Sequence, residues 1–159
     1  MTLRSPIHRS AKRQALTALA CIALVLSSTA ASATSDSNRA AALSYVRGKC
    51  LGKETHVDTS MWLSGVRFNA LFGNCRATDG HDQHIWFFDR GRFIGTDARH
   101  SSREIFGMWR DDKMMAFMYV LYRRQDPMCC PMGGGKIVRF RWDGAHVRAL
   151  DRIPPVGLR

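Results

Sequence analysis

The stretch KIVRFRWDGAHVRAL, residues 136–150, has the pattern of a β-hairpin. Its centre, Asp143-Gly144, is typical of two-residue hairpin turns, because glycine accepts a positive φ. With that turn, Trp142 lies opposite Ala145, Phe140 opposite Val147 and Val138 opposite Ala149, all on one apolar face. A slip of one residue would mix apolar and polar side chains on each face, so the pattern predicts this register.

The other face of the predicted hairpin carries three arginines, Arg139, Arg141 and Arg148. The two-residue turn places Arg139 opposite Arg148, and Arg141 opposite His146. Like charges directly opposite one another are destabilising. The arginines therefore either pair with a carboxylate such as Asp151 or form a strip that binds an anion, and a plain solvated face is the alternative to a site. Arg139, Arg141 and Arg148 are the candidate binding residues.

The hairpin closes a series of predicted strands that begins at His84. The strands are expected over residues 84–88, 92–96, 105–110, 113–124, 136–142 and 145–150. Within the fourth, Met114–Tyr122 is apolar on both alternating faces, which predicts a central strand covered on both sides. Residues 49–83 show no clean hydrophobic period, and their structure is left open.

One strong helix signal precedes the strands. Residues 38–47 are rich in alanine, Asp36 or Ser37 is a suitable N-cap, and Gly48 stands where a helix commonly ends. The sequence therefore predicts an α+β domain over residues 38–155, with an N-terminal helix packed on a curved antiparallel meander of five to six strands. An all-β sandwich or barrel is the alternative.

Residues 1–33 have the three zones of a signal peptide. Four basic residues precede an apolar segment over residues 15–26, and Ala31-Ser32-Ala33 is a suitable cleavage site. The apolar run is shorter than the ~18 residues that a spanning helix needs, so no transmembrane span is expected after cleavage. Residues 34–37 are expected to be a flexible stub. The protein is predicted to be exported, to the periplasm, the cell envelope or the extracellular space.

Cys21 offers a different processing route, in which the chain is cleaved before Cys21 and acylated there. The apolar segment before that cut would be residues 15–20 alone, shorter than the usual ~7–15 residues. Residues 22–26, also apolar, would remain on the mature protein. The sequence therefore favours cleavage after Ala33 without a lipid.

The composition predicts an anionic partner. Removal of residues 1–33 takes away four basic residues and no acidic one, which lowers the formal net charge from +11 to +7. A positive surface attracts anionic lipid, an anionic wall polymer or an acidic envelope protein. No specific nucleic acid is expected, and a solvated basic surface without a partner is the alternative.

Four cysteines remain after cleavage: Cys50, Cys75, Cys129 and Cys130. An even number in an exported chain predicts disulfides. Adjacent Cα atoms lie ~3.8 Å apart, closer than the ~4.4–6.8 Å usual in a disulfide. This argues against a bond between Cys129 and Cys130. The expectation is that these two cysteines bond to Cys50 and Cys75, in either of two pairings.

No set of residues predicts a catalytic, cofactor or metal site. His81 and His84 lack a further metal ligand at a recognisable spacing. Gly133–Lys136 lacks the following Ser or Thr and the helix of a phosphate-binding loop. A secreted ribonuclease-like hydrolase, with two histidines as acid and base, is the enzymatic alternative. The sequence favours a non-enzymatic binding module.

Five motifs lie in order over residues 84–154. They are His84-Ile-Trp-Phe-Phe88, Gly91-Arg-Phe-Ile-Gly-Thr96, Cys129-Cys130-Pro131, Val138-Arg-Phe-Arg-Trp-Asp-Gly144 and Asp151-Arg-Ile-Pro154. With these motifs the segment resembles the LppP/LprE family of envelope lipoproteins. The resemblance implies an exported envelope protein and supplies no catalytic residues.

The mature protein is expected to begin at Thr34, within about two residues, and to carry no lipid, because Ala31-Ser32-Ala33 fits signal-peptide cleavage better than Cys21 fits acylation. N-terminal sequencing and intact mass of protein from an oxidising compartment test this. An acylated N-terminal Cys21 would contradict it.

Overall fold

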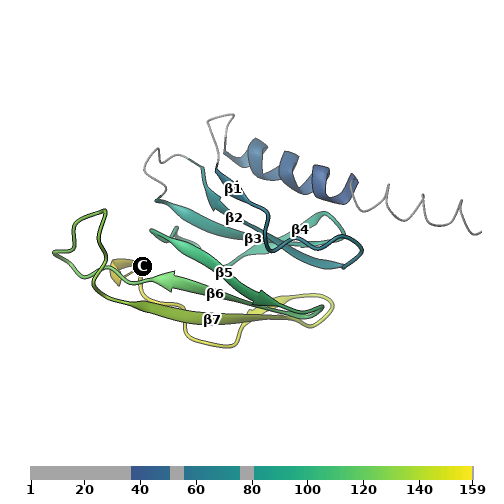
Figure 1. Cartoon of the computed structure of the whole chain (residues 1–159). Coiled ribbons are helices and arrows are strands. Elements are labelled where there is room, and N and C mark those ends of the chain that lie inside the picture. The colour runs from purple at the N-terminus through teal and green to yellow at the C-terminus, as the bar shows by residue number, and fades with distance from the viewer. Residues whose placement is uncertain (1–36, 51–55, 76–80, 159) are drawn as a thin grey trace, which may run out of the picture. The chain divides into compact units, whose positions relative to one another are not determined.

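In the computed structural model, residues 37–50, 56–75 and 81–158 are described. They form a helix over residues 37–49 and two four-stranded antiparallel sheets (Figure 1). The first sheet consists, in spatial order, of β1 (Val57–Asp58), β2 (Phe68–Asn74), β3 (Gln83–Asp89) and β4 (Arg92–Thr96). The second consists of β5 (Ile105–Arg110), β6 (Met114–Val120), β7 (Gly135–Trp142) and β8 (Val147–Ala149). A short 3-10 helix, η1 (Val156–Leu158), lies near the C-terminus.

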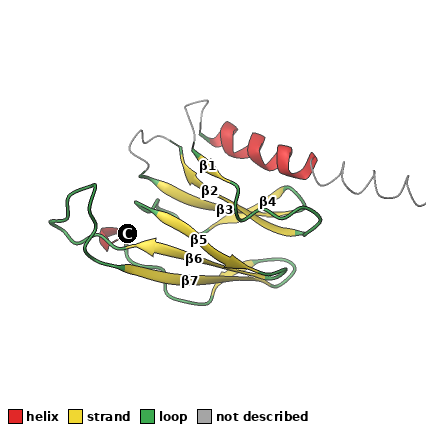
Figure 2. Cartoon of the chain, viewed as in Figure 1, coloured by secondary structure: helices red, strands yellow, loops and turns green. Residues whose placement is uncertain are grey.

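The central strands of the first sheet bury side chains on both faces. Along β3, Ile85 and Phe87 point toward the second sheet, whereas Trp86 and Phe88 point toward the helix. All four are at most 5% exposed. Because side chains alternate along a strand, a strand with no exposed face must lie between two layers. The layers are the helix, the first sheet and the second sheet (Figure 2).

Aromatic rings fill the space between the two sheets. The ring of Phe87 lies 5.7 Å from that of Phe68 on the same sheet. It lies 6.3 Å from the ring of Phe117 and 5.1 Å from that of Phe140, both on the second sheet. Full burial of one such side chain contributes about 1.5–3 kcal/mol. The contact between the sheets is therefore the main source of stability.

The prediction of one helix with antiparallel strands is confirmed, but the single meander of five to six strands is wrong. The predicted strands from residue 84 onward correspond to β3–β8. However, β4 and β5 do not pair, because the chain leaves the edge of one sheet and enters the edge of the other. The two sheets face each other as in a sandwich, the alternative architecture, and they do not close into a barrel.

The helix covers the outer face of the first sheet. Ala42 and Val46, one turn apart, are fully buried in a cluster with Leu71 and Trp86. The helix extends to residue 49, so Gly48 lies inside its last turn rather than beyond it. The predicted signal peptide and the first three residues of the predicted stub lie outside the described residues.

The disulfide pairing expected from the sequence is wrong. Cys50 is bonded to Cys75, with Cα atoms 4.7 Å apart, and Cys129 is bonded to Cys130, with Cα atoms 3.8 Å apart. Cys50 follows the helix and Cys75 follows β2, so their bond fastens the end of the helix to the first sheet. The prediction failed because it treated a preferred Cα separation as a limit.

Arg110 of β5 fastens the second sheet to the first. Its Nη1 donates to the carbonyl of Met61 and to Oδ1 of Asn69, both at 2.6 Å, and its Nη2 donates to the carbonyl of Phe68, also at 2.6 Å. Burial lowers the pKa of Arg110. The guanidinium thus hydrogen-bonds two backbone carbonyls and shares Oδ1 of Asn69 with the backbone N–H of Leu63.

A second polar bridge joins the sheets through Asp97, which follows β4. Its Oδ2 accepts a hydrogen bond from the Tyr119 hydroxyl of β6 at 2.7 Å, and its Oδ1 accepts one from the backbone of Ile85 at 3.0 Å. The side chain of Asp97 is fully buried. The carboxylate therefore sets the position of β6 relative to β3.

Substitution Arg110→Met should lower the free energy of unfolding by about 2–4 kcal/mol, because it leaves buried acceptors without donors. Arg110→Lys should be destabilising too, since an ammonium does not reproduce the guanidinium fork. Denaturant unfolding measures both. The control, Arg99→Met at an exposed site, should change stability by less than about 0.5 kcal/mol. Equal unfolding midpoints for Arg110→Met and Arg99→Met would contradict the bridging role.

Candidate binding surface

The second sheet has one face in the core and one face outside it. On β6, Met115, Phe117 and Tyr119 point into the core, so the alternate residues point outward. Strand pairing continues this outward face across β5, β7 and β8 in three rows of opposed residues. The rows are Phe106–Met118–Ile137, Trp109–Ala116–Arg139 and Met114–Arg141–Arg148. We call these nine residues the outward face; six of them are exposed, Met114 and Met118 are partly buried, and Ala116 is 0% exposed.

The outward face is apolar at one end. Phe106 is 43% exposed and Ile137 50% exposed, with Met118 partly buried between them. Trp109, in the next row, is 42% exposed and lies at the β-bulge of β5. Single exposed apolar residues are common, but a group of them on one face is typical of an interaction surface. The sequence pattern predicted that Met114–Tyr122 is covered on both sides, and that prediction left no room for exposed apolar side chains on the strands beside it.

Arg139, in the middle row, is paired with Asp151. Its Nε and Nη2 donate to the two carboxylate oxygens at 2.8 and 3.0 Å, and its backbone N–H donates to Oδ2 at 2.9 Å. The side-chain hydrogen bonds from Arg139 are the main reason that the pKa of Asp151 falls to about 2. They also raise the pKa of Arg139. Arg139 therefore adds little net charge to the outward face.

Arg141 and Arg148 are the two arginines at the other end of the face. They lie directly opposite one another on β7 and β8, and both are exposed. Nε of Arg148 lies 3.6 Å from a carboxylate oxygen of Asp143, while the Arg148 side chain remains 75% exposed. Arg141 also lines an open depression of about 670 Å³ that contains Asp111, Asp112, Lys113 and Met114. The structure thus brings Arg141 and Arg148 together and leaves Arg139 in a separate ion pair.

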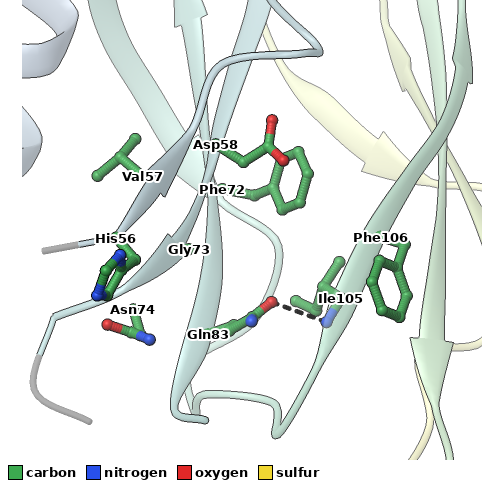
Figure 3. Close-up of a pocket in the computed structure, with 9 residues that line it drawn as sticks. All are labelled: His56, Val57, Asp58, Phe72, Gly73, Asn74, Gln83, Ile105 and Phe106. Atoms are coloured by element: carbon green, nitrogen blue, oxygen red, sulfur yellow. Dashed lines mark hydrogen bonds between the residues drawn. The ribbon is translucent and has the colours of Figure 1, made fainter. Parts of the chain in front are cut away.

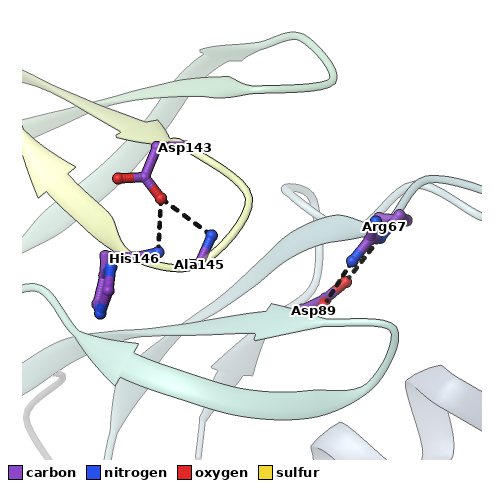
Figure 4. A network of polar contacts seen from close by, with 5 residues as sticks. All are labelled: Arg67, Asp89, Asp143, Ala145 and His146. Carbon is purple, nitrogen blue, oxygen red and sulfur yellow. Dashed lines mark hydrogen bonds and ion pairs between the residues drawn. The ribbon is translucent and has the colours of Figure 1, made fainter.

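The turn of the final hairpin is longer than predicted. Trp142 pairs with Val147 instead of Ala145, so Asp143–His146 form a four-residue connection. The Asp143 carboxylate accepts hydrogen bonds from the backbone of Ala145 and His146 at 2.9 and 2.8 Å (Figure 4). These two bonds lower the pKa of Asp143. Because the shift is two residues, each side chain keeps its predicted face and changes its partner.

Another arginine missed at the sequence level is fixed on the first sheet. Arg67, before β2, donates to both oxygens of Asp89 at 3.0 and 2.9 Å (Figure 4). Its guanidinium lies 4.8 Å from the ring centre of Trp142. The hydrogen bond to Asp89 raises the pKa of Arg67. This pair joins the ends of the two inner strands of the first sheet to an aromatic side chain of the second, so its role is structural.

A cavity of about 350 Å³ opens at one end of the space between the sheets (Figure 3). Asn74 and Gln83 lie directly opposite one another there, and Gln83 accepts a hydrogen bond from the backbone of Ile105 at 2.8 Å. Oδ1 of Asn74 is buried with no hydrogen-bond partner in the described structure. His56 is the one histidine among the described lining residues. The sequence had no signal for this cavity, because Asn74 lies in the segment without a clear period.

The histidines considered as metal ligands or as acid and base have separate surroundings. Nδ1 of His81 lies 3.3 Å from the carbonyl of Arg103, and its ring packs edge-on against Tyr122. Nδ1 of His84 lies 3.8 Å from Asp97. In the part of the chain that the structure describes, no cluster of three or more His, Cys, Asp or Glu side chains is suited to a metal ion.

Residues 68–145 match the family model described as LppP/LprE lipoprotein. The match runs from the start of β2 into the connection between β7 and β8, and it confirms the resemblance found in the motifs. The family indicates an envelope-associated protein. No curated protein and no solved structure matches the chain. Within the described residues, no helix has the length and apolar character needed to cross a membrane.

The ion pair of Arg139 predicts a specific pH dependence. The Asp151 carboxyl should titrate near pH 2 in the folded protein, below its ordinary value of 3.8. Since the folded-state pKa is depressed, the ionised group stabilises the fold above about pH 4, and this contribution is lost as the pH falls toward 2. Carboxyl-detected NMR measures the midpoint. In Arg139→Gln the midpoint should rise, and an identical midpoint in both proteins would contradict the pairing.

Proposed function

We propose that this chain, whose residues 68–145 match the LppP/LprE lipoprotein family, is an exported, non-enzymatic binding module of the cell envelope that attaches to an anionic envelope component through the outward face. The supporting observation is the arrangement of that face, with two exposed arginines at one end and exposed aromatic and aliphatic side chains at the other. An anionic surface with an apolar layer below its charged groups, such as a lipid bilayer, complements both the arginine end and the apolar end of the outward face.

The charge for this attachment comes from Arg141 and Arg148. Two opposed guanidinium groups without a shared carboxylate repel each other mildly, and an anion placed between them relieves that repulsion. Each guanidinium offers a planar fork that fits two oxygens of a phosphate or carboxylate. Arg139 has a supporting role. It lies in the row beside Arg141 and Arg148, and its side chain is held by Asp151 at 2.8 Å.

The apolar end of the face distinguishes this proposal from a solvated basic surface. A solvated basic surface does not account for exposed Phe106, Trp109 and Ile137 on the same face of one sheet. Arginine and tryptophan are both enriched at protein interfaces, and tryptophan also suits the boundary between lipid head groups and acyl chains. An anionic bilayer or an envelope protein with an acidic rim would each use both ends of the outward face.

The described geometry favours binding over the enzymatic alternative. A ribonuclease-like hydrolase needs two imidazoles and a cation around one cavity. Around the interlayer cavity, the described lining residues include His56 alone of the histidines. His81 contacts the carbonyl of Arg103, whereas His84 lies near Asp97, and neither lines this cavity.

The proposal predicts that Arg141→Gln/Arg148→Gln weakens binding to anionic vesicles of phosphatidylglycerol and phosphatidylcholine. Each basic residue near an anionic membrane contributes about 1 kcal/mol, so the double variant should bind about 30-fold more weakly. Binding of the unaltered protein should fall steeply with salt, since exposed charges are screened over about 8 Å at physiological ionic strength. Vesicle co-sedimentation measures both effects, and retention on a polyphosphate column separates lipid from polymer binding.

The matched control removes the same charge from the helix, as Arg39→Gln/Arg47→Gln, where both arginines are exposed. A loss of binding equal to that of the hairpin variant would show a bulk charge effect and overturn the proposed site. A second variant, Phe106→Ser/Ile137→Ser, keeps the charge and should also weaken binding. Unchanged binding of that variant would show that the apolar end of the outward face does not contribute to binding.

A further inference from the structure

The two disulfides differ in what they connect. Cys50–Cys75 joins residues 25 apart in the chain, and Cys50 is 3% exposed within the cluster beneath the helix. Cys129–Cys130 joins neighbours, and both residues are exposed. A cross-link stabilises a fold mainly by restricting the unfolded chain, and the effect grows with the length of the closed loop. A bond between adjacent residues closes almost no loop, so Cys129–Cys130 has little structural use.

The loop that carries Cys129 and Cys130 is held by other interactions. Oδ2 of Asp126 accepts hydrogen bonds from the backbone of Arg123 at 2.7 Å and of Met132 at 2.8 Å. The Tyr122 hydroxyl donates to the carbonyl of Met128 at 3.3 Å. None of these bonds involves a cysteine sulfur. The loop can therefore keep its shape when the bond between the two cysteines opens.

The surroundings of the adjacent cysteines suit sulfur exchange. Met128 is 49% exposed and Met132 60% exposed, so no bulky layer covers the loop. Thiol–disulfide exchange requires access of the attacking thiolate to a sulfur, and both cysteines are exposed. Exposed disulfides are the more labile ones.

We infer that Cys129–Cys130 is a thiol–disulfide exchange site that takes a dithiol as its reductant, whereas Cys50–Cys75 is a static cross-link. A thiolate of the dithiol attacks Sγ of one cysteine, the bond between the cysteines breaks, and the other cysteine leaves as a thiolate that takes up a proton. The second thiol of the reductant loses its proton, attacks the mixed disulfide and releases the first cysteine. Two electrons pass to the protein, and the reductant leaves as its own disulfide. This site is separate from the outward face and does not rest on the proposed function.

The test follows reduction of the native exported protein by dithiothreitol. Samples are alkylated at intervals, and the labelled cysteine peptides are measured by mass spectrometry. Cys129–Cys130 should be reduced at least about tenfold faster than Cys50–Cys75, because the buried bond reacts only after local opening. The difference should vanish in denaturant, and excess oxidised glutathione, added after dithiothreitol is removed, should restore the bond between Cys129 and Cys130. Equal native rates, or a reduced pair that does not close again, would overturn the inference.

A matched pair of variants separates exchange from structure. Cys129→Ser/Cys130→Ser should melt within about 2 °C of the unaltered protein, whereas Cys50→Ser/Cys75→Ser should melt several degrees lower. Cys130→Ser alone should accumulate a mixed disulfide at Cys129 when it meets the disulfide of a monothiol, such as oxidised glutathione, since no neighbouring thiol is left to resolve it. If Cys129→Ser/Cys130→Ser unfolds, the bond is structural and the inference is wrong.

Discussion

Burial of both faces of β2 and β3 is the constraint from which the rest of the architecture follows. Two adjacent strands with apolar residues at odd and even positions cannot face water on either side. One side is covered by the helix, through Ala42 and Val46, and the other by a complete second sheet. The stack therefore contains two apolar contact layers around one sheet. The second sheet, with a single layer against it, retains an outer surface that is open for other uses.

Polar groups then fix the position of the second sheet on the first more closely than apolar packing does. Phenyl rings tolerate small displacements, but the hydrogen bonds of Arg110 and Asp97 do not. Arg110 joins β5 to the start of β2, and Asp97 joins β3 to β6. Strand pairing sets which residues share the outward face, and these two polar contacts set how the sheet that carries it lies on the first sheet.

The helix and strands that could be predicted from the sequence are those whose apolar residues follow a single helical or strand period. The helix and the strands from His84 onward each show such a pattern, and the faces of Phe140, Arg139 and Arg141 follow from alternation. β2 was not predictable, because Phe68–Asn74 is buried at every position and contains Asn and Gly. The break between β4 and β5 was missed because antiparallel neighbours usually pair. Arg148 received the wrong partner because a two-residue shift of the turn preserves every face.

The order of strands within each sheet has a consequence for how the chain acquires its structure. Within each sheet, every strand pairs with its neighbour in sequence, so the first sheet closes its hydrogen bonds within residues 57–96 and the second within residues 105–149. A polypeptide that emerges N-terminus first, from a ribosome or a translocation channel, can thus complete one sheet before the other appears. During that interval Phe72, Ile85 and Phe87 face solvent. The partly folded chain is therefore prone to aggregate until the second sheet covers them. The yield of folded protein therefore depends on how fast residues 105–149 emerge after the first sheet.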